Sequence, residues 1–141
     1  MYRDLIAQLG AIRVTALHGI SCLAAGADQL FVRAVMAAGG TYEAILPAED
    51  YRDRVVESSC RSEFDELTAG ATSVSCMPFE TSSRAAYMAA SEELIRRSDR
   101  LFAVWDGTRS GRVGETGHVV AAARQRQVPV TVVWPVGAAR E

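Results

Sequence analysis

Apolar residues along the chain follow two alternating spacings, one typical of short buried strands and one typical of helices. The run Leu101-Phe-Ala-Val-Trp105 is continuously apolar, which predicts a buried strand. Residues 82–97 carry apolar side chains at three- and four-residue intervals, which predicts a helix with one inward face. The whole pattern predicts helices at 2–10, 27–38, 82–97 and 116–126, a helix within 48–70, and strands at 12–18, 42–46, 72–77, 100–105 and 128–134.

Strands that alternate with helices of this length indicate βαβ units and parallel pairing, with right-handed crossovers. The chain has 141 residues, enough for one domain with a core of its own. The sequence therefore predicts an α/β fold: a single Rossmann-like three-layer domain over residues 1–141, with an open, mainly parallel sheet of about five strands and helices on both faces. In such sheets, ligands bind beyond the carboxyl ends of the strands.

The first candidate site is the loop of small residues that follows the strand at 12–18. Backbone N–H groups of this loop could cradle a phosphate, and an acidic side chain could bind sugar hydroxyls. The alternative is a tight turn in which the glycines only satisfy the geometry. Cys22 in this loop and Tyr87 near a helix start each allow a functional role or a packing role. The ligand-binding candidates here are Gly19, Ser21, Gly26 and Asp28.

The second candidate site is the acidic and glycine-rich loop that leads from the strand at 100–105 to the helix at 116–126. A helix start favours an anion, and glycines let the backbone approach it closely. Glu115 allows two interpretations: a carboxylate that stabilises the helix start by roughly 0.3–1 kcal/mol, or a catalytic carboxylate in a sugar site. The ligand-binding candidates here are Asp106, Gly107, Gly111, Gly114, Thr116 and Gly117.

The charge and composition of the chain argue against several classes of function. A net charge of −2 and the lack of a basic stripe argue against a nucleic-acid partner. No stretch approaches the roughly 18 apolar residues of a membrane span, and the first residues lack a signal-peptide layout. Three cysteines and two histidines without metal-ligand spacing predict no metal site, no other cofactor and a reduced, cytoplasmic setting.

When the two loops are considered together, the chain resembles the SLOG superfamily, which includes the LOG/lysine-decarboxylase-like and DNA-processing-protein-A-like Rossmann domains. The resemblance covers roughly residues 12–135, and the order of its motifs is more specific than any one motif. The matching stretches are residues 19–31, 44–51, 101–107 and 114–120. Related domains usually begin with a strand, whereas this chain begins with a predicted helix, so the usual first strand is expected to be missing.

The resemblance implies a domain that binds a nucleotide or nucleotide-derived small molecule at the carboxyl ends of the strands, as a sensor or ligand-binding domain. Its phosphate would rest on residues 111–117, and its ribose would reach Asp106 and the loop at 21–28. Some relatives cleave N-glycosidic bonds, which implies the alternative of a nucleotide or nucleoside N-glycosidase or a deoxyribosyltransferase-like enzyme with Glu115 as the catalytic carboxylate. A third interpretation is a protein-interaction module with a vestigial cleft, because the first strand is missing. An unfinished sheet edge also allows a homodimer.

Overall fold

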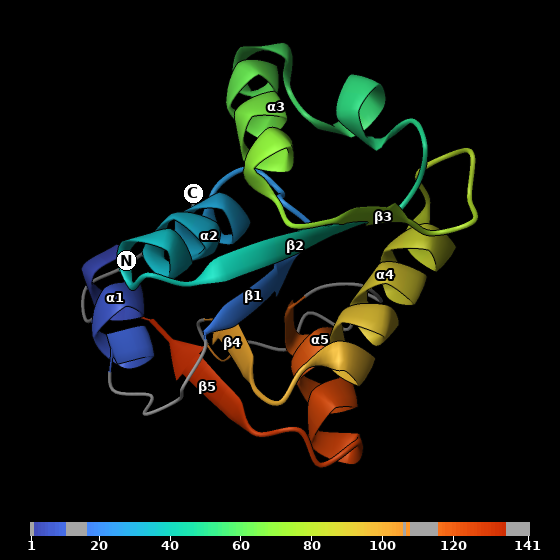
Figure 1. Cartoon of the computed structure of the whole chain (residues 1–141). Coiled ribbons are helices and arrows are strands. Elements are labelled where there is room, and N and C mark those ends of the chain that lie inside the picture. The colour runs from blue at the N-terminus through green and yellow to red at the C-terminus, as the bar shows by residue number, and fades with distance from the viewer. Residues whose placement is uncertain (1, 11–16, 106, 108–115, 135–141) are drawn as a thin grey trace.

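The computed structural model describes residues 2–10, 17–105, 107 and 116–134, in which helices and strands alternate along the chain (Figure 1). Helices predicted at 2–10, 27–38, 82–97 and 116–126 are confirmed to within two residues at each end. The elements are α1 (Tyr2–Gly10), β1 (His18–Ser21), α2 (Ala27–Ala37), β2 (Thr41–Leu46), a π-helical turn (Tyr51–Val55), a 3-10 turn (Ser58–Cys60), α3 (Arg61–Gly70), β3 (Val74–Cys76), α4 (Arg84–Arg97), β4 (Leu101–Val104), α5 (Thr116–Gln125) and β5 (Val130–Val133).

The first strand lies further along the chain than the sequence predicted. β1 begins at His18 and continues to Ser21, where the sequence predicted a loop, and residues 12–16 of the predicted strand lie outside the described residues. Gly19 resembled a turn glycine, but it marks a close approach between a helix and a strand. A Cβ at Gly19 would lie 3.0 Å from Cγ2 of Val35 on α2. The glycine therefore lets α2 pack directly on β1.

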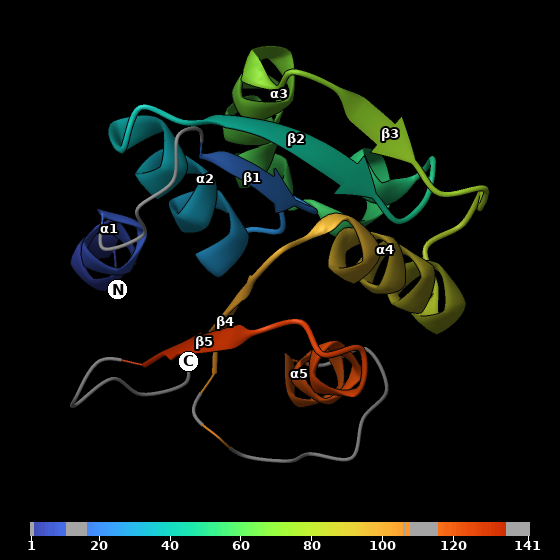
Figure 2. The ribbon, with the colours of Figure 1, turned by 60° about the horizontal axis from the view of Figure 1, so that its bottom comes forward.

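The strands form two parallel sheets, with the orders β1-β2-β3 and β4-β5. In Figures 1 and 2, β4 and β5 run across the direction of the first three strands. The α/β class with parallel pairing is confirmed, whereas the described strands do not join into the single five-stranded sheet that the sequence predicted. Between the sheets, Phe31 of α2 contacts Phe102 of β4, with ring centroids 6.0 Å apart. This aromatic contact therefore joins α2 to the second sheet.

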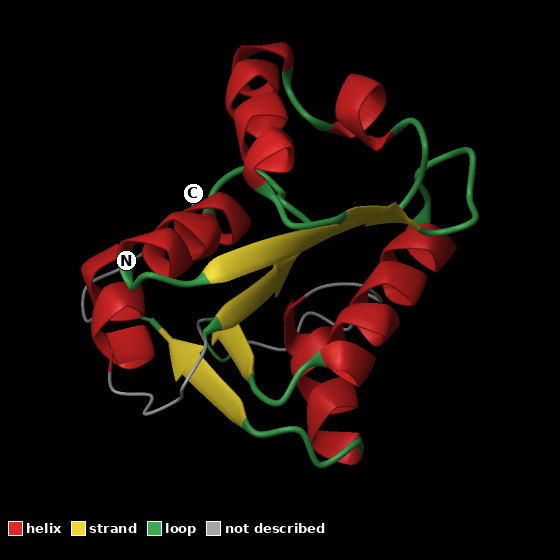
Figure 3. Ribbon diagram, viewed as in Figure 1, coloured by secondary structure: helices red, strands yellow, loops and turns green. Residues whose placement is uncertain are grey.

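The side chains of β2 alternate between two helical environments, as the pleat of a strand requires. Tyr42 and Ala44 belong to a buried cluster with Val32 of α2 and Leu67 of α3. Glu43, on the other face, pairs with α4 through Arg97. Figure 3 shows α3 and α4 on opposite sides of β2. The three-stranded sheet is therefore covered by helices on both faces.

Tyr42→Phe is expected to lower the free energy of unfolding by about 1 kcal/mol. The Tyr42 hydroxyl is buried and donates a 2.6 Å hydrogen bond to the carbonyl oxygen of Leu67, which ties β2 to α3. Urea denaturation measures the change, with Tyr2→Phe on the exposed side of α1 as the matched control. Equal effects of the two substitutions would contradict this role for the buried hydroxyl.

Candidate functional site

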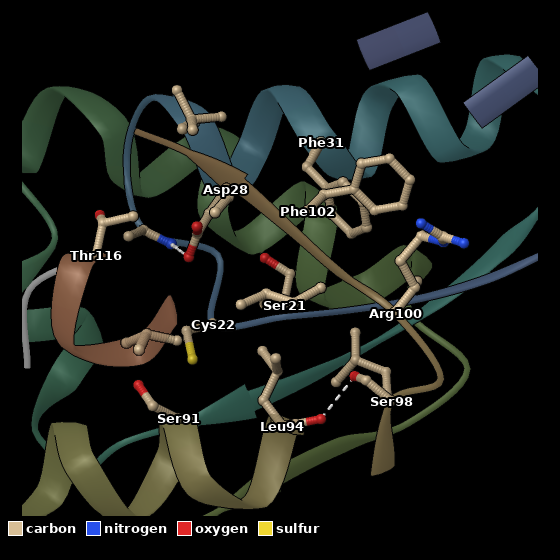
Figure 4. Close-up of a pocket in the computed structure, with 18 of the residues that line it drawn as sticks. Ser21, Cys22, Asp28, Phe31, Ser91, Leu94, Ser98, Arg100, Phe102 and Thr116 are labelled. Atoms are coloured by element: carbon tan, nitrogen blue, oxygen red, sulfur yellow. Dashed lines mark hydrogen bonds between the residues drawn. The ribbon is translucent and has the colours of Figure 1, made fainter. Parts of the chain in front are cut away.

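A cavity of about 760 Å³ lies between the two sheets (Figure 4). All four residues of β1 and all four of β4 line it, together with side chains from α1, α2, α4 and α5. Its size falls in the range of about 300–1,000 Å³ that is usual for small-molecule sites. The separation of the sheets thus creates a space large enough for a ligand.

The turn between β1 and α2 is fixed by its own side chains. The buried Ser21 hydroxyl oxygen accepts a 3.0 Å hydrogen bond from the Leu23 amide, and Asp28 Oδ2 accepts one of 3.2 Å from the Ala24 amide. The Gln29 side chain donates to the Leu23 carbonyl oxygen at 3.3 Å. Two of the amides predicted to cradle a phosphate are therefore already bonded to the protein itself.

Gly26 adopts a backbone conformation in this turn that favours glycine. It precedes α2 with a φ of 89°, a value that glycine adopts without strain, and its carbonyl oxygen accepts a hydrogen bond from the Leu30 amide. Gly26 is not among the residues that line the cavity, whereas Gly19, Ser21 and Asp28 are. Of the first predicted group, these three residues share the cavity wall.

Asp28 is the acidic group at this end of the cavity. Neighbouring atoms enclose its side chain, and the part that stays accessible lines the cavity. Burial raises the pKa of the Asp28 carboxyl, and the Ala24 amide opposes that rise only in part. Among the described residues, none supplies a cation that contributes to the shift. Within the described part of the chain, Asp28 is therefore an enclosed carboxyl group whose charge is not offset by an arginine.

The groups beside Asp28 are held in their neutral forms. Burial, with a further contribution from Asp28, raises the pKa of the Cys22 thiol to about 12. Burial and the same carboxylate also raise the pKa of the Tyr51 hydroxyl. Because a reactive cysteine needs a thiolate, these surroundings favour the packing role for Cys22. Tyr87 lines the same cavity and contacts Tyr51 edge to face, with ring centroids 6.4 Å apart.

The structure describes only some of the residues predicted for the second candidate site. Thr116 begins α5 and lines the cavity with Ser21 and Asp28. Gly107, with a φ of 88°, and Gly117 are described but are not among the lining residues. Asp106, Gly111, Gly114 and the predicted catalytic residue Glu115 lie outside the described residues. The two chain segments singled out in the sequence therefore meet at one cavity through Ser21, Asp28 and Thr116.

Several lining residues were missed by the sequence analysis. The sequence predicts an ordinary helix at Phe31 and a buried strand from Arg100 through Phe102, and neither prediction marks these residues as part of a cavity wall. Helical spacing carries no signal that separates a cavity-lining side chain from a core side chain. The charged residue directly before an apolar strand was the one available signal for Arg100.

The following two statements hold for the described part of the chain. Within it, no group of three or more histidine, cysteine, aspartate or glutamate residues is placed to hold a metal ion. None of its helices has the length and apolar character needed to cross a membrane.

Comparison of the chain with models of known protein families gives no match, and comparison with curated proteins gives none either.

Proposed function

We propose that the protein binds a nucleotide or nucleotide-derived small molecule in the cavity between β1 and β4. The observation that carries this proposal is the convergence of Ser21, Asp28 and Thr116, which come from two separate chain segments, on one cavity of about 760 Å³. Hydroxyl and carboxyl groups bind sugar hydroxyls and base amino groups, while Phe31 and Phe102 offer aromatic surface for a ring. The resemblance of the motif order to that of the SLOG superfamily implies the same class of ligand.

The proposal is limited to binding. An N-glycosidase or deoxyribosyltransferase would depend on Glu115, which lies outside the described residues. Two described carboxyl groups line the cavity: Asp28, which already accepts a hydrogen bond from the Ala24 amide, and Asp99, which is exposed. Hydrolysis of an N-glycosidic bond commonly uses two carboxyl groups on opposite sides of that bond. Binding alone is therefore the function for which the described residues supply the necessary groups.

A thermal-shift experiment tests the proposal directly. The four common nucleoside 5′-monophosphates and their nucleosides are added singly to the protein. A ligand at about 100 times its Kd stabilises the folded state by about 2.7 kcal/mol, which raises the melting temperature by several degrees. A panel with no shift at millimolar concentrations, repeated by calorimetry, would contradict the proposed function.

Ser91→Trp is expected to weaken binding of any nucleotide that the panel identifies by at least about tenfold. Ser91 lies on α4 with its side chain directed into the cavity (Figure 4), so an indole ring there would occupy the ligand's space. Ala85→Trp places the same ring on the exposed side of the same helix, away from the cavity, and is the matched control. Isothermal titration calorimetry measures both affinities. Unchanged binding by Ser91→Trp would place the ligand outside this cavity.

A further inference from the structure

The cavity has two chemically different ends. β1 and β4 each contain four residues, so at about 3.3 Å per residue the ends of each strand lie about 10 Å apart. Ser21, Cys22, Asp28 and Thr116 lie at one end, and Arg100 lies toward the other, beside Phe31 and Phe102 (Figure 4). An extended nucleoside monophosphate covers a span of this length.

Of the described residues that line this second end, Arg100 is the arginine that is not paired with a carboxylate among them. Arg97 also lines the cavity, but it pairs with Glu43 at 2.9 Å and with Glu93 at 2.8 Å, and His18 bonds the same Glu43. Among the described residues, Arg100 donates a 3.0 Å hydrogen bond to the Thr131 hydroxyl, which is neutral. Asp99 lines the cavity as well and keeps this end from being uniformly positive. The guanidinium of Arg100 is thus bonded to a group that carries no charge.

The described side chains at the opposite end include no cation. A phosphate there would meet the Asp28 side chain, which lines the cavity, and an ionised carboxylate repels an anion at close range. The amides of Leu23 and Ala24 are bonded to Ser21 and Asp28, so they are not free to hold the phosphate oxygens. Of the phosphate site predicted at residues 111–117, only Thr116 and Gly117 are described, and a phosphate beside Thr116 would share this end of the cavity with Asp28.

We propose that the ligand is an amphoteric small molecule of the nucleoside monophosphate class. Its phosphate binds Arg100, its ring lies against Phe31 and Phe102, and a hydroxyl or amino group donates to Asp28. This inference rests on the proposed function and adds the direction in which the ligand lies. An arginine guanidinium can hold two phosphate oxygens at once, and a carboxylate can only accept hydrogen bonds, so each end selects a different group of the ligand.

Calorimetric titration of the wild-type protein and of Arg100→Ala tests this orientation. The probes are the nucleoside monophosphate that binds most tightly and its nucleoside. We expect Arg100→Ala to weaken monophosphate binding about tenfold and to leave nucleoside binding within about twofold. Arg100→Lys keeps the charge and is expected to restore part of the monophosphate affinity. Arg124→Ala, on the exposed side of α5, is the control for a general loss of positive charge.

The outcomes separate the two proposals. If no nucleotide or nucleoside binds the wild-type protein, the proposed function fails and the orientation fails with it. If the monophosphate binds and Arg100→Ala changes neither affinity, or lowers both equally, the orientation alone is overturned. A melting curve for each variant shows that it is folded, and Arg100→Gln, which keeps most of the side-chain length, replaces Arg100→Ala if the latter is not.

Discussion

Leu23→Ala is expected to lower the free energy of unfolding by about 3 kcal/mol. Leu23 is fully buried in the turn between β1 and α2, where it packs in the cluster that joins β2, α2 and α3. Removing its side chain leaves a cavity at the centre of that cluster. Because a domain of this size is stabilised by roughly 5–15 kcal/mol, the change is a large fraction of the total. Urea denaturation followed by circular dichroism measures it.

Leu23→Gly is expected to be less destabilising than Leu23→Ala, by about 1 kcal/mol, which reverses the usual order of the two residues. Leu23 has a φ of 56°, a left-handed conformation that costs a residue with a Cβ roughly 1–2 kcal/mol and glycine almost nothing. Leu67, buried in α3 with no such backbone strain, is the matched position. There, glycine is expected to be worse than alanine by about 1 kcal/mol. If the glycine variant is less stable than the alanine variant at both positions, the backbone strain at Leu23 is negligible.

Helices were predictable from the sequence because their signals are local. α4 shows apolar positions at helical spacing and starts at a capping residue, Ser83, whose hydroxyl oxygen accepts a hydrogen bond from the Ala86 amide. β4 was predictable because it is short and continuously apolar. The sequence misplaced β1 because glycine is typical of turns. The reason for Gly19 is the contact with Val35, which lies sixteen residue positions away in sequence.

The site was predictable where its chemistry is local and not where it depends on the arrangement of the sheets. Ser21 and Asp28 stand out because polar side chains follow a strand and open a helix. Phe31, Phe102 and Arg100 line the cavity only because β4 and β5 run across the other strands instead of joining them. No residue spacing encodes that separation, so the cavity itself could not be foreseen.

Asp28→Asn is expected to raise the free energy of unfolding by about 1–2 kcal/mol at pH 7.5, because a neutral amide replaces an enclosed charge for which the described residues supply no cation. Burial raises the pKa of the Asp28 carboxyl in the folded protein above its unfolded value. Protonated Asp28 therefore favours the folded state, and this contribution is complete below the unfolded pKa and is lost as pH rises through the folded value. The advantage of Asp28→Asn should accordingly shrink toward zero as the pH falls to about 4. Asp50→Asn is the control, and it is expected to change stability in the opposite direction. Hydrogen bonds from Ser82 lower the pKa of the Asp50 carboxyl, so the charged form stabilises the folded protein. The Asp50→Asn variant is therefore expected to be less stable than the wild type at pH 7.5.

The same Asp28→Asn substitution is expected to weaken ligand binding about tenfold, so that the more stable protein is the poorer binder. The asparagine carbonyl oxygen takes over the hydrogen bond from the Ala24 amide, which leaves its NH2 group facing the cavity. A ligand hydroxyl or amino group that donated to the carboxylate would then meet another donor. Because this loss arises at the Asp28 end, it should affect a nucleoside and its monophosphate alike, in contrast to Arg100→Ala. A variant that gains stability and keeps full affinity would show that the charge at Asp28 does not serve the ligand.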